Sequence, residues 1–152
     1  SINAWDAVSA VIDPDYYVNL SKTPEGEFAK DLEKFADAAA ANHALCKKNN
    51  TRCLFVIIPV APWVNEKYQS YFERLGSNVS GLDQTYPPSL ENLLDKLSKR
   101  KVPFLDLLPV LKNHNDQNLY ITMDTHINFD GHRIVGHALV SELKRRNWLA
   151  KR

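Results

Sequence analysis

The chain is 152 residues long, with 44% hydrophobic and 24% charged residues and a formal net charge of +1. This composition indicates one globular domain over residues 1–152 and excludes a disordered or fibrous chain. The small net charge gives no reason to expect nucleic acid or an anionic membrane as the principal partner, and no apolar run approaches the length of a membrane span.

The N-terminal part predicts a strand followed by a loop. The apolar run Ala7–Ile12 is typical of a short buried strand, and Pro14 ends it. Tyr16 and Tyr17 then enter a loop.

A long helix is predicted next, with Thr23 as its N-cap and Pro24 at the first helical position. Apolar residues at helical spacing cover one face for about five turns. They are Phe28, Leu32, Phe35, Ala36, Ala39, His43 and Cys46. We interpret His43 as a histidine at the edge of the core rather than a metal ligand.

Two cysteines, Cys46 and Cys53, flank the connection from this helix to the next strand. They could form a disulfide in an oxidising compartment, or each could remain a small apolar side chain. The sequence leaves both alternatives open. Our working hypothesis for the compartment is an extracytoplasmic or secreted location.

The run Cys53–Ile58 predicts the central strand, and Pro59 stops it. Because its hydrophobicity is continuous rather than alternating, we expect a strand that is covered on both faces, as in parallel α/β sheets. Trp63 follows the C-terminal end of this strand, where open α/β sheets usually bind ligands. We therefore predict Trp63 as a substrate-binding residue, with simple packing as the alternative.

The second half continues the alternation of helices and strands. A helix is predicted over Asn65–Leu75, a second helix is capped by Ser89, and Val102–Leu107 forms a strand ended by Pro109. A last helix begins at His132. This alternation favours a layered α/β fold with right-handed crossovers. The three strands predicted here are fewer than the roughly five of an average sheet. The chain therefore resembles the later part of a larger doubly wound domain.

The loop before the last helix carries the reactive side chains. Asp124, His126 and Asn128 precede the turn pair Asp130-Gly131, and His132 follows at the predicted helix start. A histidine that is oriented by a carboxylate can act as a general base. In the alternative without catalysis, the acids only cap turns and the histidines bond to nearby main chain.

A metal site is a third interpretation of the same loop. Asp124, His126, His132 and His137 offer donors that zinc accepts. However, His132 and His137 diverge on a helix because they are not an i,i+4 pair. We therefore predict neither a metal site nor a cofactor.

Three segments carry a family resemblance: LFVIIP, FLDLLP and LYITMDTHINFDGHRIVGHALVSEL. Together they resemble the C-terminal half of the SGNH (GDSL-type) esterases and acyltransferases, and Asp124–His132 resembles the branch with a D-x-H-x-N-x-x-G-H pattern. The resemblance implies a three-layer α/β/α, flavodoxin-like parallel sheet. It also implies that His126 is the base that activates a serine and that Asp124 orients it, with Asn128 and His132 in support.

The Gly-Asp-Ser block that holds the nucleophile in this family does not occur in the chain, and no serine lies in a G-x-S-x-G turn. We therefore expect an acyl-ester hydrolase or O-acyltransferase whose serine lies on a missing N-terminal segment. Its substrate would be an acyl ester of a small molecule, a glycan or a lipid. The alternative is a relative without catalytic activity that binds a carbohydrate or a protein.

Overall fold

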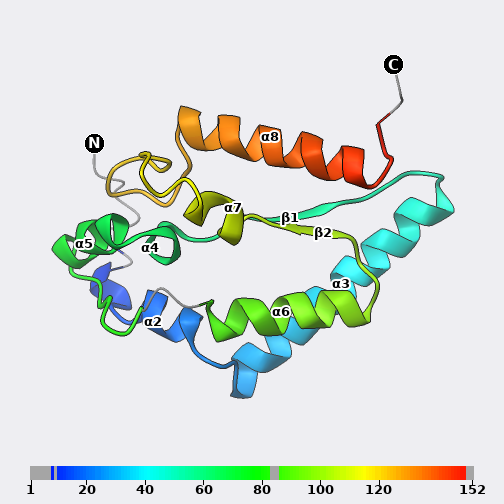
Figure 1. Cartoon of the computed structure of the whole chain (residues 1–152). Coiled ribbons are helices and arrows are strands. Elements are labelled where there is room, and N and C mark those ends of the chain that lie inside the picture. Colours follow the sequence, from blue (N-terminus) through cyan, green and yellow to red (C-terminus); the bar gives the residue numbers. More distant parts are fainter. Residues whose placement is uncertain (1–7, 9, 83–85, 150–152) are drawn as a thin grey trace.

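The computed structural model describes residues 8, 10–82 and 86–149. Two short parallel strands, β1 (Phe55–Ile57) and β2 (Phe104–Asp106), form the sheet of this part of the chain. Figure 1 shows α8 (Phe129–Arg145) on one side of the strands, with α3 (Gly26–Lys48) and α6 (Pro88–Lys99) on the other. The fold is therefore of the α/β class, with parallel strands as predicted.

Neighbouring residues of each strand serve opposite faces of the sheet. Phe55 pairs with Phe104, and both pack against the small residues of α3. Val56 pairs with Leu105, and both join the larger core that includes Ile134 of α8. Because both faces are covered, the strands read as continuous apolar runs.

Three further helices complete the larger core. They are α4 (Ala61–Val64), α5 (Glu66–Arg74) and α7 (Leu108–Lys112). Asn65 caps α5, since its side-chain oxygen accepts a hydrogen bond from the main-chain N–H of Lys67. The helix predicted over Asn65–Leu75 is thus present, whereas α4 was not predicted.

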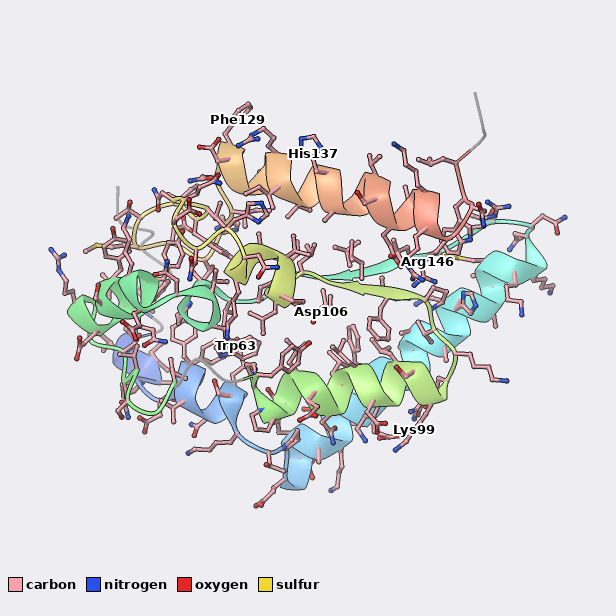
Figure 2. All side chains as sticks on the ribbon, in the orientation of Figure 1. Trp63, Lys99, Asp106, Phe129, His137 and Arg146 are labelled. Atoms are coloured by element: carbon pink, nitrogen blue, oxygen red, sulfur yellow. A yellow bond between two sulfur atoms is a disulfide. The ribbon has the colours of Figure 1, made fainter. Side chains whose placement is uncertain are left out.

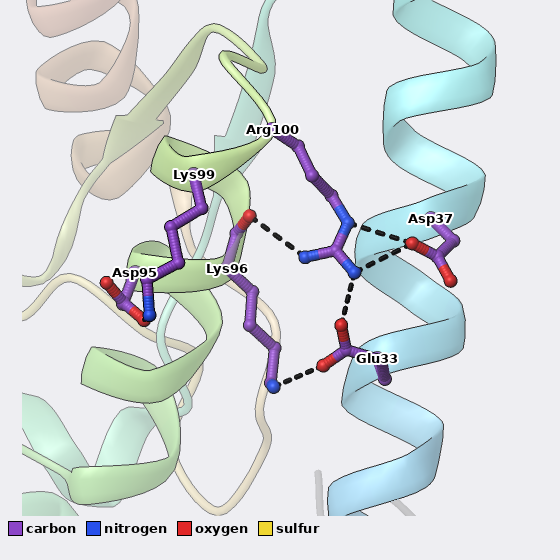
Figure 3. A network of polar contacts seen from close by, with 6 residues as sticks. All are labelled: Glu33, Asp37, Asp95, Lys96, Lys99 and Arg100. Atoms are coloured by element: carbon purple, nitrogen blue, oxygen red, sulfur yellow. Dashed lines mark hydrogen bonds and ion pairs between the residues drawn. The ribbon is translucent and has the colours of Figure 1, made fainter.

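An ion-pair network fastens α3 to α6 (Figure 3). Arg100, directly after α6, donates from Nε to Asp37 at 2.8 Å and also pairs with Glu33. Lys96 pairs with the second oxygen of Glu33. The two helices also share an apolar contact through Ala36, so the charges border a packed interface.

The end of α8 is attached to the beginning of β2. Glu142 accepts hydrogen bonds from Arg145 and Arg146, and Arg146 also donates to the carbonyl oxygen of Phe104 at 3.1 Å. The guanidinium of Arg146 lies 5.5 Å from the ring centre of Trp148. This cluster covers part of the outer edge of β2.

The N-terminal predictions were wrong in three places. Val8 and residues 10–12 are helical rather than extended, and Ala7 lies outside the described residues. The aromatic pair opens a helix, α2 (Tyr16–Ser21), because Tyr17 packs edge-on against Phe72 of α5 with ring centres 4.9 Å apart. Residues 22–25 connect α2 to α3. The long helix therefore starts at Gly26 and not at Thr23 or Pro24.

Later helix starts also differ from the predictions. Pro87 is the N-cap of α6, while Ser89 is buried and donates to the carbonyl oxygen of Leu20. Pro109 lies inside the first turn of α7, where its missing N–H costs little. Phe129 is the first residue of α8, before the predicted start at His132.

Cys46 and Cys53 form a disulfide with Cα atoms 6.2 Å apart. It joins the end of α3 to the segment that leads into β1, so the first of the two alternatives for these cysteines is the one observed. No helix in the described ranges combines the length and the hydrophobicity that a membrane crossing requires.

Acid should weaken the fold through Glu142. Hydrogen bonds from Arg145 and Arg146 lower the pKa of Glu142 from 4.5 to about 2. A carboxyl group with a lowered pKa contributes stability above its unfolded pKa, and this contribution is lost as the pH falls from about 4.5 toward about 2. We expect a Glu142→Gln variant to show a weaker decline in the free energy of unfolding over this range, measured by urea denaturation.

The matched control is Glu27→Gln, which removes an exposed carboxylate paired with Lys30 on α3. It should retain the pH dependence of the unchanged protein. Some decline should persist in both variants, because hydrogen bonds from Lys96 and Arg100 lower the pKa of Glu33 to about 2. An identical decline in both variants would contradict the assignment to Glu142.

Candidate functional site

Asp124 and His126 are in direct contact in the loop before α8. Nδ1 of His126 lies 2.5 Å from Oδ1 of Asp124, and the main-chain N–H of His126 donates to the same oxygen at 2.8 Å. The Asp124 side chain is 15% exposed, whereas that of His126 is 73% exposed. Because a carboxylate can only accept, Nδ1 carries the hydrogen and Nε2 is the nitrogen that can take up a proton.

A tight turn holds the two side chains in this contact. The N–H of Ile121 donates to the carbonyl oxygen of His126 at 2.9 Å, and the N–H of Asp124 donates to that of Ile121 at 3.1 Å. Met123 has a φ of 57°, which is unusual for a residue with a side chain. The loop is thus fixed by its own main chain.

Buried tyrosines anchor the start of the loop. Tyr120 is fully buried, and its hydroxyl donates to the carbonyl oxygen of Pro59 at 2.7 Å. The hydroxyl of Tyr68 accepts from the main-chain N–H of Leu119 at 2.6 Å. Burial raises the pKa of Tyr120, so its hydroxyl stays a donor. The contact with Pro59 places the loop beside the segment that follows β1.

Asn128 joins the end of the loop to α8. Its side-chain oxygen accepts from the N–H of Gly131 at 3.0 Å and thereby caps the helix. Its side-chain amide donates to the carbonyl oxygen of Asn118 at 2.5 Å. Its main-chain N–H donates to the carbonyl oxygen of Leu119 at 2.9 Å. Asn128, predicted as a supporting residue, thus bonds to both ends of the Asp124–His126 loop.

Gly131 meets a steric constraint that the sequence did not reveal. The pair Asp130-Gly131 was interpreted as a turn, but both residues lie in the first turn of α8. A Cβ atom at position 131 would collide with the carbonyl oxygen of Leu119. Glycine is therefore needed for close approach of two main-chain segments, and only the folded arrangement exposes this need.

His132 does not join the contact between Asp124 and His126. Its N–H donates to the carbonyl oxygen of Asn128 at 2.9 Å, and the residue is exposed on α8. Within the part of the chain that the structure describes, no three His, Cys, Asp or Glu residues gather closely enough to hold a metal ion. A supporting role for His132 stays a prediction.

Trp63 lies in α4 (Figure 2). It lines a separate cavity of about 380 Å³. Its indole N–H donates to the hydroxyl of Ser21 at 2.7 Å, which fixes the ring against α2. The other lining residues are Val18, Ser21, Lys22, Ser80, Gly81, Leu82, Pro87 and Pro88. Asp124 and His126 are not among them, so the structure does not bring Trp63 together with the Asp124–His126 pair.

The sequence patterns did not predict a polar pair, Tyr86 and Asp106, at the C-terminal end of β2. The hydroxyl of Tyr86 donates to Asp106, and the other oxygen of Asp106 accepts from the N–H of Leu108 at 2.9 Å. Burial is the largest cause of the raised pKa of the Tyr86 hydroxyl, and the hydrogen bond to Asp106 raises this pKa further. The sequence signal for this pair is the acid Asp106 inside the apolar run FLDLLP. We interpret that run only as a strand.

Residues 16–152 match the family described as "SGNH hydrolase-like domain, acetyltransferase AlgX". The chain belongs to this family. The match confirms the SGNH resemblance and includes the whole Asp124–His132 segment. No curated protein and no solved structure matches the chain.

Gly131→Ala should lower the free energy of unfolding by about 2–3 kcal/mol, because the added methyl group meets a main-chain oxygen that cannot easily move. Gly136→Ala is the matched control on the same helix, since among the described residues no atom beyond its chain neighbours and the backbone of its own helix lies within 4 Å of its Cβ position. It should stabilise the protein by about 0.5–1 kcal/mol. Urea denaturation measures both, and equal effects would contradict the packing argument.

Proposed function

We propose that this chain is the later part of an SGNH domain that transfers or hydrolyses acyl esters, with His126 as general base and Asp124 as the residue that orients it. The single observation that supports this most is their 2.5 Å contact, in which Asp124 is mostly buried and His126 is mostly exposed. Such a carboxylate fixes the tautomer of the imidazole and stabilises the imidazolium. Membership of the family supports the same chemistry.

The proposed reaction has two stages. Nε2 of His126 takes the proton from a serine hydroxyl while the serine oxygen bonds to the ester carbonyl carbon, and the proton then passes to the departing alcohol. Water in a hydrolase, or an acceptor hydroxyl in a transferase, then attacks the carbonyl carbon of the acyl-serine while Nε2 of His126 takes its proton. The bond from the acyl group to the serine oxygen breaks, and the proton returns to that oxygen. The description of the family as an acetyltransferase favours transfer of an acetyl group to an acceptor such as a glycan, although small esters and lipids are further substrate classes.

The serine, we propose, lies on a segment outside these residues that adds to the sheet at β1. The N–H of Phe55 and the carbonyl oxygen of Ile57 pair with the β2 segment at 3.0 and 3.1 Å. Since neighbouring residues of a strand point their main-chain groups in opposite directions, those of Leu54, Val56 and Ile58 face the other edge. No described residue forms a hydrogen bond with them.

An open edge of this kind is a template for another strand. Two short strands form a sheet of marginal stability, and parallel sheets are normally buried on both faces. Further strands at β1 would extend the sheet between the helix layers and complete a three-layer α/β/α, flavodoxin-like domain. We propose that residues 1–152 all belong to this one domain.

The position of the Asp124–His126 loop supports this completion. Tyr120, at the start of the loop, donates to the carbonyl oxygen of Pro59, two residues after the end of β1. A parallel strand added at β1 would end at the same edge of the sheet, beside this loop. A serine that follows such a strand would come within reach of His126.

The disulfide between Cys46 and Cys53 supports an oxidising, extracytoplasmic compartment for this reaction. Disulfides persist there, whereas the cytosol keeps most thiols reduced. We retain this compartment as part of the proposal.

The test is hydrolysis of p-nitrophenyl acetate. The 152-residue chain should show no turnover that depends on His126, because it lacks the nucleophile. The longer protein with its flanking sequence should turn over the ester, and Asp124→Asn should lower kcat by about a hundredfold or more. Asp95→Asn is the matched control, since Asp95 is an exposed carboxylate paired with Lys99 on α6.

Turnover by the short chain that is lost in His126→Ala would overturn the proposal of an external serine. A longer protein without turnover, together with measurable binding of a glycan or a protein, would favour the non-catalytic alternative. The cavity beside Trp63 would then be the first place to seek that ligand, because a fixed indole ring lines it.

A further inference from the structure

We propose that the groove between α7 and α8 binds a small organic carboxylate with an apolar body. Figure 1 shows α7 beside the first half of α8. The groove between them has a volume of about 570 Å³. Its lining residues are Val110, His114, Gln117, Arg133, Ile134, His137, Ala138 and Ser141. Since neither Asp124 nor His126 is among them, this site goes beyond the proposed acyl transfer.

One wall of the groove is a column of hydrogen-bond donors on α8. Arg133, His137 and Ser141 follow one another at i,i+4 spacing and therefore stand on one face of the helix, where Figure 2 labels His137. Ile134 and Ala138 lie beside them and supply apolar surface. A ligand in the groove would thus meet charged and apolar groups side by side.

The opposite wall comes from α7 and the turn after it. The N–H of His114 donates to the carbonyl oxygen of Leu111 at 3.0 Å, and the N–H of Gln117 donates to that of His114 at 3.0 Å. The ring nitrogen Nδ1 of His114 lies 2.9 Å from the carbonyl oxygen of Val110. The imidazole is therefore held in place, and Nε2 is the nitrogen that remains for a ligand.

The charges of the groove select an anion rather than a metal cation. Arg133 carries a permanent positive charge, and no carboxylate belongs to the lining given above. Asp130 approaches Arg133 only to 3.7 Å, which is longer than a hydrogen bond and leaves donors of the guanidinium for a ligand. Guanidinium groups bind carboxylates in a bidentate manner.

The apolar residues narrow the class of anion. Val110 and Ala138 are partly exposed and would be left in contact with water by an inorganic ion, whereas a ring or a short alkyl chain would cover them. Because Nδ1 of His114 donates to a carbonyl oxygen, its Nε2 can donate to the carboxylate only when the ring is protonated. The titratable groups that line the groove are His114, His137 and Arg133, with Asp130 nearby.

The experiment titrates the 152-residue chain with benzoate, benzyl alcohol and inorganic phosphate, and follows the imidazole proton resonances of His114 and His137 by NMR. We expect benzoate to shift both resonances saturably and to bind at least about tenfold more tightly than either other probe, because only benzoate satisfies both the charge and the apolar surface. Equal affinity for benzoate and benzyl alcohol would overturn the proposal, as would an absence of saturable shifts.

Arg133→Gln should weaken benzoate binding by about tenfold, because it removes a charge-assisted hydrogen bond while preserving a polar side chain. Arg74→Gln is the matched control, since Arg74 lies at the end of α5 and does not line the groove. It should leave the affinity unchanged. Equal losses in both variants would mean that net charge alone attracts benzoate, which would also overturn the proposal. Circular dichroism verifies that both variants are folded.

Discussion

The close approach of the segment 118–120 to the first turn of α8 is the contact on which the candidate site depends. Asn128 bonds to the carbonyl oxygens of Asn118 and Leu119, and Gly131 leaves the space that this approach requires. The two ends of the intervening loop are thereby held together. The carboxylate of Asp124 is mostly buried within this frame, and His126 extends into solvent. A small number of hydrogen bonds therefore orients the imidazole of His126 without burying it.

The same loop is connected to the sheet through Tyr120, whose hydroxyl donates to the carbonyl oxygen of Pro59, two residues after β1. At the outer edge of β2, the side chain of Arg146 donates a hydrogen bond to the carbonyl oxygen of Phe104. The β1 edge differs, because the main-chain groups of Val56 that point away from β2 have no hydrogen-bond partner among the described residues. Helices cover both faces of a sheet that is narrow in this part of the chain. The unpaired edge lies on β1, the strand whose following segment bonds to Tyr120 at the start of the loop.

Local patterns in the sequence predicted the elements whose residues all have the same kind of surroundings. The run around β1 reads as a buried parallel strand because both of its faces are covered, and the contact between Asp124 and His126 follows from their nearness in the chain. Local patterns failed where contacts between residues far apart in the chain determine the structure. Tyr17 is helical because Phe72 packs against it, and no local signal places Trp63 against Ser21. The requirement for glycine at the start of α8 also arises only when two segments meet.

The central claim is that the Asp124–His126 pair serves a serine outside the 152 residues. Labelling of the longest form of the protein with a fluorophosphonate, followed by mass spectrometry of its peptides, tests this most directly. The account predicts one labelled serine outside the 152 residues, with labelling abolished in His126→Ala. A label on a serine within them, or labelling that is independent of His126, would contradict the account.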